Sequence, residues 1–299
     1  MTGGAVSVVV PVRDHAGHLP RLLARLARQD YLGALDVIVV DNHPRPRLCH
    51  QHYLSYPMPV TVLHEARAGL ARARNRGINA ASGEWVLVTE ADTLPCAGWV
   101  SAMVRALANS GAPLVGGQVL PDYPTAEGPL LGKGVLSLFM PTAWPSALTE
   151  VGGRWLLAGC NLGMPRSATL TFDPDLGAGG RFLMCEDLVT TMSTQAAGEF
   201  ALLVPGAVVR RVLHDQDLTV RAVARRAWWH GVALARAAHS MPSANLPQYP
   251  LRDVAPWSRG FSKAWLLSAL AGVARIAGRR AHRRGLRHQA PRKAVHTCA

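Results

Sequence analysis

The stretch Gly83–Pro95 (GEWVLVTEADTLP) combines a short apolar run with two carboxylates that stand one residue apart. The run from Trp85 to Val88 predicts a strand, and Glu90 and Asp92 follow it directly. Side chains at i and i+2 of an extended segment point the same way, so both carboxylates can reach one hard cation at the end of the strand. In the alternative interpretation, the segment is only a turn in which Asp92 and Thr93 cap a helix that we expect at residues 97–107. The surrounding sequence has to decide between the two.

Three apolar segments upstream also predict strands, of the kind that is buried on both faces of a parallel sheet. They span Ala5–Val10, Leu35–Val40 and Val60–Leu63. Two helical segments intervene before Trp85: His18–Gln29 gathers four leucines on one face, and Gly69–Ala81 carries a row of arginines. This alternation predicts an α/β fold with a Rossmann-like, mostly parallel sheet that is flanked by helices.

Ligands of such sheets bind beyond the carboxyl ends of the strands. Asp41 closes the second predicted strand, so we expect it to face the same crevice as Glu90 and Asp92. Neither a Walker-type phosphate loop nor a G-x-G-x-x-G turn follows the first strand, where the sequence reads PVRDH. The absence of both motifs weakens the kinase and dehydrogenase interpretations.

Composition and charge narrow the class of protein further. The five cysteines are scattered without a C-x-x-C, which favours reduced thiols over a zinc ribbon or a disulfide framework. The opening MTGGAVSVVVPVRDH lacks the basic segment of a signal peptide, so we expect a cytoplasmic protein. Ten of the 32 lysines and arginines follow Val254 with no acid among them, and the rest of the chain is nearly neutral. We therefore expect no nucleic-acid partner.

The second half of the chain begins with an irregular stretch, Pro121–Trp155, which is rich in Gly and Pro and predicts a substrate-facing insertion. Its two indoles, Trp144 and Trp155, stack on a sugar in one interpretation and pack against the core in the other. More regular segments follow. Leu156–Arg166 is an ordered segment, and Met184–Met192 opens a helix. We expect strands at Ala201–Val204 and Ala207–Leu213, and a long helix at Leu218–His239.

A group of histidines and one cysteine near residue 50 has no spacing typical of a metal site. Most of it lies in PRPRLCHQHY, which is typical of a loop, and we expect no metal there. The group consists of His43, Cys49, His50, His52 and His64.

Six segments, in this order, resemble the family 2 glycosyltransferases: VSVVVPVRD, VIVVDN, GLARARNRGINAASGEWVLVTEAD, AGCNLGMPR, CEDL and VLH. The resemblance covers about Val6 to Gly231, and it implies an inverting enzyme of the GT-A fold that uses a nucleotide-diphospho-sugar. The chain departs from the family pattern at Glu90, where the family's metal motif begins with an aspartate. Asp92 matches the last acid of that motif.

The resemblance also implies where the donor binds. Asp92 would hold Mn²⁺ or Mg²⁺ with His214 as second ligand, and a cation there would neutralise the charge that the leaving diphosphate gains. Asp41 would accept the N3–H of uracil, which favours a UDP-sugar. The structural alternatives stay open: a packed or capping His214, and a solvated helix face for the arginines of Gly69–Ala81. The other donor-binding positions are Pro11, Val12, Arg13, Arg74, Asn75, Glu90 and Ala91.

By the same resemblance, catalysis falls to the acid pair Glu186–Asp187. Inversion needs one carboxylate to take the proton of the acceptor hydroxyl while that oxygen attacks the anomeric carbon, and the match makes Asp187 this base. In the alternative interpretation, the two acids only stabilise the start of a helix through its dipole. The sugar or acceptor pocket is expected at Trp155, Gly159, Cys160 and Asn161.

These features predict a glycosyltransferase domain over residues 1–240, with a helical and basic tail over residues 241–299. The expected acceptor is a hydroxyl of a small molecule or of a lipid-linked compound. Two rival functions remain open. One is a glycoside hydrolase with Asp92 and Asp187 as its carboxylate pair, which leaves Asp41 and the arginine helix unexplained. The other is a non-catalytic relative that binds sugar nucleotides, as the departure at Glu90 suggests.

The tail contains an amphipathic segment, Phe261–Gly278, and seven basic residues in the 15 positions that follow it. Only 11 residues separate Lys263 from Arg275, whereas a membrane-spanning helix needs about 20 apolar residues. Two expectations stand side by side. The tail lies on an anionic surface such as the inner face of the membrane, or it packs on the catalytic domain.

Overall fold

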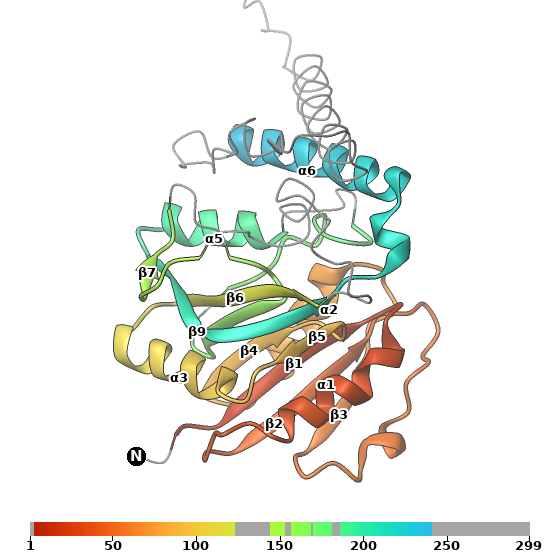
Figure 1. Cartoon of the computed structure of the whole chain (residues 1–299), viewed down its shortest axis with the longest axis vertical. Helices are drawn as coiled ribbons and strands as arrows, with labels where there is room; N and C mark the ends of the chain where they lie inside the picture. The colour runs from red at the N-terminus through yellow and green to blue at the C-terminus, as the bar shows by residue number, and fades with distance from the viewer. Residues whose placement is uncertain (1–2, 123–143, 153–156, 169, 181–185, 241–299) are drawn as a thin grey trace, which may run out of the picture.

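The computed structural model describes residues 3–122, 144–152, 157–168, 170–180 and 186–240. Most of the predicted insertion, including Trp155, and the whole tail 241–299 lie outside the described residues. Figure 1 shows a single curled sheet with helices packed along it.

One half of the sheet is parallel. Its strands are β1 (Val6–Val12), β2 (Leu35–Asp41), β3 (Val60–His64) and β4 (Trp85–Thr89), in the spatial order β3-β2-β1-β4. All seven residues of β1 are buried, as its valine-rich sequence requires of a central strand that is covered on both faces. The four predicted strands are confirmed, although β1 continues through Pro11.

Helices cover both faces of this parallel half. α1 (Leu19–Leu26) buries its four leucines in the core cluster that contains Val8, and α3 (Trp99–Ser110) joins the same cluster. α2 (Leu70–Ala80) packs on the other face, in the cluster that contains Val9. Successive residues of β1 therefore pack into the cores on opposite faces of the sheet. This is the doubly wound arrangement that the sequence predicts.

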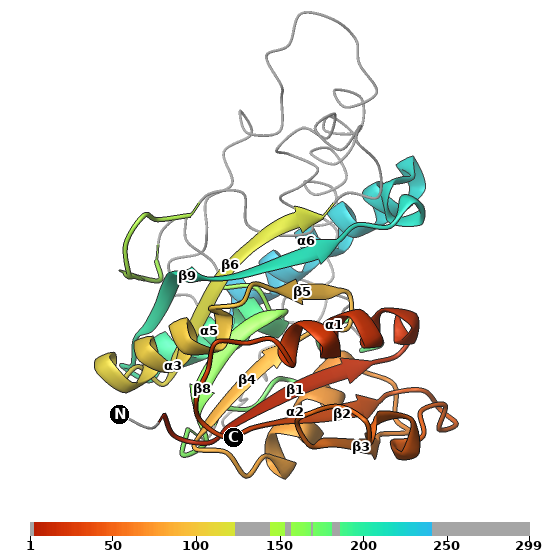
Figure 2. The ribbon, with the colours of Figure 1, turned by 60° about the horizontal axis from the view of Figure 1, so that its bottom comes forward.

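The other half of the sheet is mixed (Figure 2). β8 (Asn161–Pro165) runs antiparallel to both β4 and β6 (Leu114–Asp122), and β9 (Ala201–Val212) runs parallel to β6. The short strands β5 (Thr93–Pro95) and β7 (Thr149–Glu150) each pair antiparallel with β9. The expected parallel order thus holds from β3 to β4, and the entry of β8 in the opposite direction makes the remainder mixed.

β9 forms one continuous strand where the sequence predicts two. Pro205 and Gly206 interrupt its apolar pattern, and its register against β6 shifts between Gly117 and Gln118. A Cβ atom added to Gly117 would lie 2.0 Å from the carbonyl oxygen of Ala207. Only a glycine fits at this irregularity without moving the neighbouring backbone.

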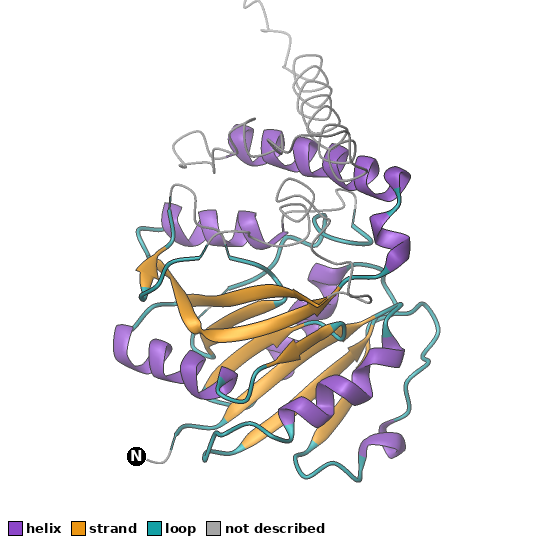
Figure 3. Ribbon diagram, in the orientation of Figure 1, coloured by secondary structure: helices purple, strands orange, loops and turns teal. Residues whose placement is uncertain are grey.

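Two described α-helices belong to the second half of the chain: α5 (Glu186–Ala196) and α6 (Val220–Ser240). Figure 3 shows them beside the mixed half of the sheet, away from β3. Three short 3₁₀ helices complete the described elements: η1 (Ala16–His18), η2 (His50–Tyr53) and η4 (Asp215–Leu218). Among these described helices, none is both long enough and apolar enough to cross a bilayer.

Candidate active site

Glu90 and Asp92 lie in a turn between β4 and β5. The expectation of an extended segment is wrong here, because the backbone N–H and the hydroxyl of Thr93 both donate to the carbonyl of Glu90, at 3.0 and 2.7 Å, and close the turn. The alternative interpretation as a helix cap is also wrong. α3 begins after Gly98, and no side chain caps it.

The two carboxylates nevertheless meet at one cationic group, the guanidinium of Arg211 on β9. Its Nη2 lies 3.1 Å from Glu90 Oε2, and its Nε lies 3.5 Å from Asp92 Oδ2. Burial alone would lower the pKa of Arg211, but Asp92 and Glu90 outweigh it and raise the pKa. Nearby Arg226 has its pKa lowered to about 10 because it is buried and close to Arg211. This corner of the site therefore carries positive charge from the chain itself.

The sequence interpretation did not single out Arg211. The residue stands 121 positions from Glu90, and the two meet because β5 and β9 pair with Arg211 opposite Thr93. No local pattern carries this information. The only signal in the sequence is an arginine near the end of an apolar strand, where a buried charge needs a partner.

Arg74 is fully buried and bridges two carboxylates. Its Nη2 lies 2.7 Å from Glu90 Oε1 and its Nη1 lies 2.6 Å from Glu186 Oε1, while the guanidinium sits over the ring of Phe172 at 5.1 Å. Burial disfavours the charge, but Glu186 and Glu90 outweigh it and raise the pKa of Arg74. The solvated-face interpretation is wrong for Arg74, because its side chain is fully buried and binds two acids within the protein. Contact between Arg74 and a donor stays a prediction.

Asn75 also has a structural place in this arrangement. Its side chain donates to the carbonyl of Phe172 at 2.8 Å and accepts from the Phe172 backbone N–H at 2.9 Å. These two hydrogen bonds hold the segment that covers Arg74. Contact between Asn75 and a donor stays a prediction.

The acid pair opens α5, as predicted, and its two members have different environments. Glu186 is committed to Arg74. Asp187 accepts from the backbone N–H of Gly159 at 2.8 Å and from that of Leu188 at 2.8 Å. Burial and the neighbouring Glu186 charge raise the pKa of Asp187 to about 6, although Arg74 and both hydrogen bonds act in the opposite direction. Asp187 is thus a carboxylate whose proton affinity suits general base work near neutral pH.

Gly159 brings the β8 entry loop close to this ion-pair network. A Cβ atom at Gly159 would lie 2.6 Å from Arg74 Nη2. The backbone at position 159 thus lies so close to the guanidinium that only glycine fits there. Of the neighbouring predicted pocket residues, Cys160 is buried, and burial raises the pKa of its thiol to about 12.

Asn161 has a structural place in the sheet, and its expected role in a sugar or acceptor pocket stays a prediction. It is fully buried at the start of β8, where its Oδ1 accepts from the indole of Trp99 at 2.7 Å. Its Nδ2 donates to the carbonyls of Gln118 and Ala207, each at 2.9 Å. These three hydrogen bonds use Asn161 to tie β8 to α3, β6 and β9. Trp144 is half-buried against the core, which agrees with the packing interpretation of that indole.

Asp41 lies at the carboxyl end of β2, as predicted, but its carboxylate is buried. One oxygen accepts from His43 N at 3.1 Å, and the other accepts from Leu48 N at 2.9 Å and from Arg47 N. Asp41 thereby orders the loop that follows its strand. Upstream, Pro11 and Val12 are buried in β1. Arg13 is exposed, and its Nε lies 3.9 Å from Asp14 Oδ2.

Asn42 has a bridging role that the sequence interpretation did not assign. Its side chain donates to the carbonyls of Glu65 and Arg67, both at 2.8 Å, and accepts from Gly69 N at 2.9 Å. It connects the end of β2 to the loop before α2. The loops at the carboxyl ends of β2 and β3 are therefore held by hydrogen bonds between side chains and the backbone.

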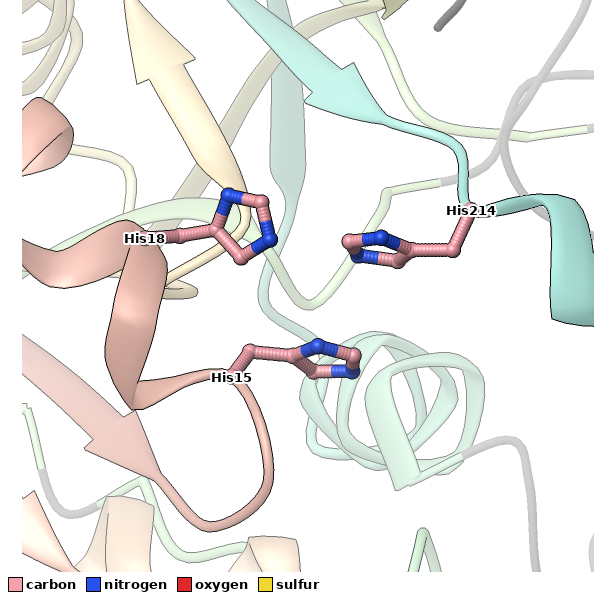
Figure 4. A group of neighbouring side chains, drawn as sticks. All are labelled: His15, His18 and His214. Carbon is pink, nitrogen blue, oxygen red and sulfur yellow. The ribbon is translucent and has the colours of Figure 1, made fainter.

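The residues predicted to hold a metal have unused ligand atoms. Asp92 Oδ1 and His214 Nε2 are both buried and have no hydrogen-bond partner among the described residues. A buried polar atom without a partner is costly, and a bound cation is one kind of partner for such an atom. His214 also lies beside His15 and His18 (Figure 4). The pKa of His18 is lowered by burial and by repulsion from His214 and His15, while Asp92 acts in the opposite direction.

Together, the parallel βαβ half, the acid turn after β4 and the mixed half with its acid-headed helix make up a fold of the GT-A type. Residues 7–128 match the family model described as glycosyl transferase family 2.

Relatives in sequence carry transferase names. The pre-mycofactocin glycosyltransferase of Mycobacterium tuberculosis is 25% identical over 297 residues, which cover 91% of this chain and 54% of that protein. An N-acetylglucosaminyltransferase of Bradyrhizobium elkanii is 31% identical over 121 residues, which cover 39% of this chain and 66% of that protein. Glycosyltransferase AglE of Haloferax volcanii is 29% identical over 123 residues, 40% of each chain. The chain spans about half the length of the curated relatives it matches first.

Solved structures share the fold. The mannosyltransferase PcManGT of Pyrobaculum calidifontis, in complex with GDP-Man and Mn²⁺, superposes with a TM-score of 0.58 at 19% identity, over 97% of this chain and 77% of that one. TarS 1–349 of S. aureus, in complex with UDP, has a TM-score of 0.54 at 15% identity, over 96% and 92% of the two chains.

Proposed function

We propose that this chain is an inverting glycosyltransferase that moves a sugar from a nucleotide-diphospho-sugar, of the UDP class, to an acceptor hydroxyl. The observation that carries the proposal is the Arg74 bridge, which holds the acid turn after β4 and the acid pair of α5 together at one place. Two solved neighbours contain GDP-Man or UDP, which supports a nucleotide-sugar donor.

In the proposed reaction, Asp187 is the general base. The acceptor hydroxyl gives its proton to a carboxylate oxygen of Asp187 while its own oxygen attacks the anomeric carbon, and the nucleoside diphosphate leaves from the opposite face. The hydrogen bonds from Gly159 and Leu188 hold the carboxylate in one orientation. The neighbouring Glu186 carboxylate is bound to Arg74 and so has a different partner from Asp187.

On the donor side, Asp92 and His214 would hold Mn²⁺ or Mg²⁺, and their unpartnered buried atoms fit that role. A divalent cation supplies neutralisation of the charge that develops on the leaving diphosphate. The guanidinium of Arg211 lies beside the proposed metal ligand Asp92 and pairs with both Glu90 and Asp92. It therefore places a positive charge near the proposed diphosphate site. Asp41 is proposed to read the N3–H of uracil through Oδ1, which accepts only one backbone N–H.

The acceptor and the location in the cell belong to the same proposal. The acceptor is a hydroxyl of a small molecule or of a lipid-linked compound, and the protein works in the cytoplasm at the inner face of the membrane. Support comes from the basic tail after residue 240, which suits an anionic surface. We also propose residues 1–240 as the catalytic domain.

A donor screen tests the function. Thermal shift with nucleoside diphosphates and manganese ranks the bases, and sugar variants of the best nucleotide are then assayed for transfer to hydroxyl acceptors. Transfer with inverted anomeric configuration is the expected result. Release of free sugar without an acceptor would replace the proposal with a hydrolase, and tight donor binding without any turnover across the acceptors would replace it with a binding protein.

A further inference from the structure

Three imidazoles from distant parts of the chain gather at one end of the sheet. His15 and His18 lie between β1 and α1, and His214 directly follows β9 (Figure 4). One ligand atom of each residue lies within 4.8 Å of the corresponding atoms of the other two. No other group of three or more His, Cys, Asp or Glu residues meets this criterion among the described residues.

The local structure explains why His15 and His18 face the same way. They stand three residues apart across η1, and a 3₁₀ helix has three residues per turn, so side chains at i and i+3 lie above one another. The ring of His214 stacks on His15 with centroids 4.7 Å apart and an interplanar angle of 4°. The ring of His18 meets His214 edge-on, with centroids 4.9 Å apart at 60°.

One nitrogen of this cluster has an unused lone pair or N–H. His214 Nε2 is buried with no hydrogen-bond partner in the described part of the chain, which fits the role of a metal ligand. Around a tetrahedral cation with metal–nitrogen distances of about 2.0–2.1 Å, ligand nitrogens lie roughly 3.4 Å apart. Ring rotations that move the nitrogens by about 1 Å would bring three atoms now within 4.8 Å to that spacing. All three residues are partly exposed, so the rings have room to turn.

We propose that His15, His18 and His214 form a three-imidazole site for a borderline transition-metal cation such as Zn²⁺ or Co²⁺. Imidazole ligands favour these ions, whereas Mg²⁺ and Mn²⁺ prefer carboxylate and carbonyl oxygens. Three protein ligands leave one tetrahedral position open for water or an anion. The site shares His214 with the cation site of the proposed function, but its occupation requires neither a donor nor sugar transfer.

The test is metal binding to the full chain in the absence of nucleotide. Calorimetric titrations with Zn²⁺, Co²⁺ and Mg²⁺ are run on the wild type, on the double variant H15N/H18N, and on the control H50N/H52N. The control removes the same number of histidines from η2, where both are exposed. We expect one tight Zn²⁺ or Co²⁺ site, with weak Mg²⁺ binding, in the wild type and in the control. Loss of an outer-shell partner of a metal-bound histidine typically costs 10- to 100-fold in metal affinity. In H15N/H18N, which loses two direct ligands, the Zn²⁺ affinity should fall by at least that much.

Two results would overturn the site: equal Zn²⁺ affinity in H15N/H18N and wild type, or wild-type protein that binds Zn²⁺ no better than Mg²⁺. Chemical footprinting of histidines covers the case in which the double variant fails to fold. Zn²⁺ should protect His15, His18 and His214 of the wild type from acylation, and unchanged labelling of all three would also reject the proposal. Failure of sugar transfer leaves these readouts untouched, so the two proposals fail independently.

Discussion

At the scale of single residues, the two adjacent acids of α5 have different partners and therefore different properties. Glu186 binds the buried Arg74, whereas within the described residues Asp187 accepts from the backbone N–H groups of Gly159 and Leu188 and has a pKa raised to about 6. The Glu186 carboxylate is therefore held in an ion pair with Arg74. Asp187 is left with the proton affinity that a base needs.

Asp187→Asn should lower kcat by roughly 10² to 10⁴, the usual contribution of a general base, with donor affinity little changed. It should leave stability equal or higher above pH 6, because the folded state disfavours the ionised carboxylate that the amide replaces. Steady-state kinetics, donor calorimetry and urea unfolding measure the three quantities. Glu199→Gln, at an exposed acid just after α5, is the control. A larger kcat loss in Glu186→Gln would exchange the two roles.

The raised pKa of Asp187 also predicts a pH profile. The base is active when ionised, and its pKa is raised from 3.8 to about 6, so kcat/KM should fall about tenfold per pH unit below pH 6 and level off above it. The same shift favours the protonated fold, so the stability cost of the ionised group disappears as the pH falls from 6 toward 4. A profile that stays flat down to pH 4.5 would exclude Asp187 as the base.

Arg74→Gln should destabilise the fold strongly. It leaves Glu90 and Glu186 facing each other at a buried position with no cation between them, and breaking such a pair from one side typically costs about 3–5 kcal/mol. Arg76→Gln on the exposed side of the same helix is the control, with little expected change. Urea unfolding of both variants measures the difference. Equal midpoints would mean that the bridge contributes nothing to stability.

At the scale of elements, the decisive feature is the β6–β9 pair. The register shift at Gly117 lets β9 pass Pro205 and Gly206 and remain one strand, and it brings Arg211 to the acid turn. Asn161 fastens the same place by donating to the carbonyls of Gln118 and Ala207.

Gly117→Ala and Gly206→Ala form a matched pair at this irregularity. A Cβ at Gly117 would collide with the Ala207 carbonyl at 2.0 Å, whereas one at Gly206 would meet only Ala102 Cβ at 3.8 Å. The first substitution should lower the free energy of unfolding by about 1–3 kcal/mol or more, and the second should be nearly neutral. Thermal or urea unfolding distinguishes them. Similar losses in both would show that the bulge does not depend on close approach of the two backbones.

At the scale of the whole molecule, the parallel half and the mixed half meet along β4 and β8, and the candidate site lies where they meet. The first half supplies the acid turn and Arg74, and the second supplies Glu186, Asp187 and Arg211. Neither half contains the site alone. The basic tail after residue 240 is the part of the sequence from which we predict binding to an anionic membrane surface.

The tail predicts salt-sensitive binding to anionic vesicles. Each basic residue near such a surface contributes about 1 kcal/mol before screening, so replacing Arg279, Arg280, Arg283 and Arg284 by Gln should weaken binding by roughly a hundredfold or more at low salt. Sedimentation with phosphatidylglycerol vesicles measures this for the full-length chain, with phosphatidylcholine vesicles as control. A wild-type protein that ignores phosphatidylglycerol at low salt would leave the tail with no membrane role.

The sequence by itself determined the strands and helices of the parallel half and the chemical types at the site. Apolar periodicity reports burial locally, so β1 to β4 and α1 to α3 lie where the pattern predicts them. The acid turn and the acid pair were visible for the same reason, since they directly follow a strand and open a helix.

Only the tertiary structure decided which side chains meet. Arg211 reaches Glu90, Arg74 reaches Glu186, and the histidines of η1 reach His214, through strand order and register that no local pattern encodes. Asn161 illustrates the same point, because its side chain bonds to Trp99 and to the carbonyls of Gln118 and Ala207, and no local pattern predicts these partners. Contacts between residues more than 100 positions apart depend on how the whole chain packs, and that packing assembled the site.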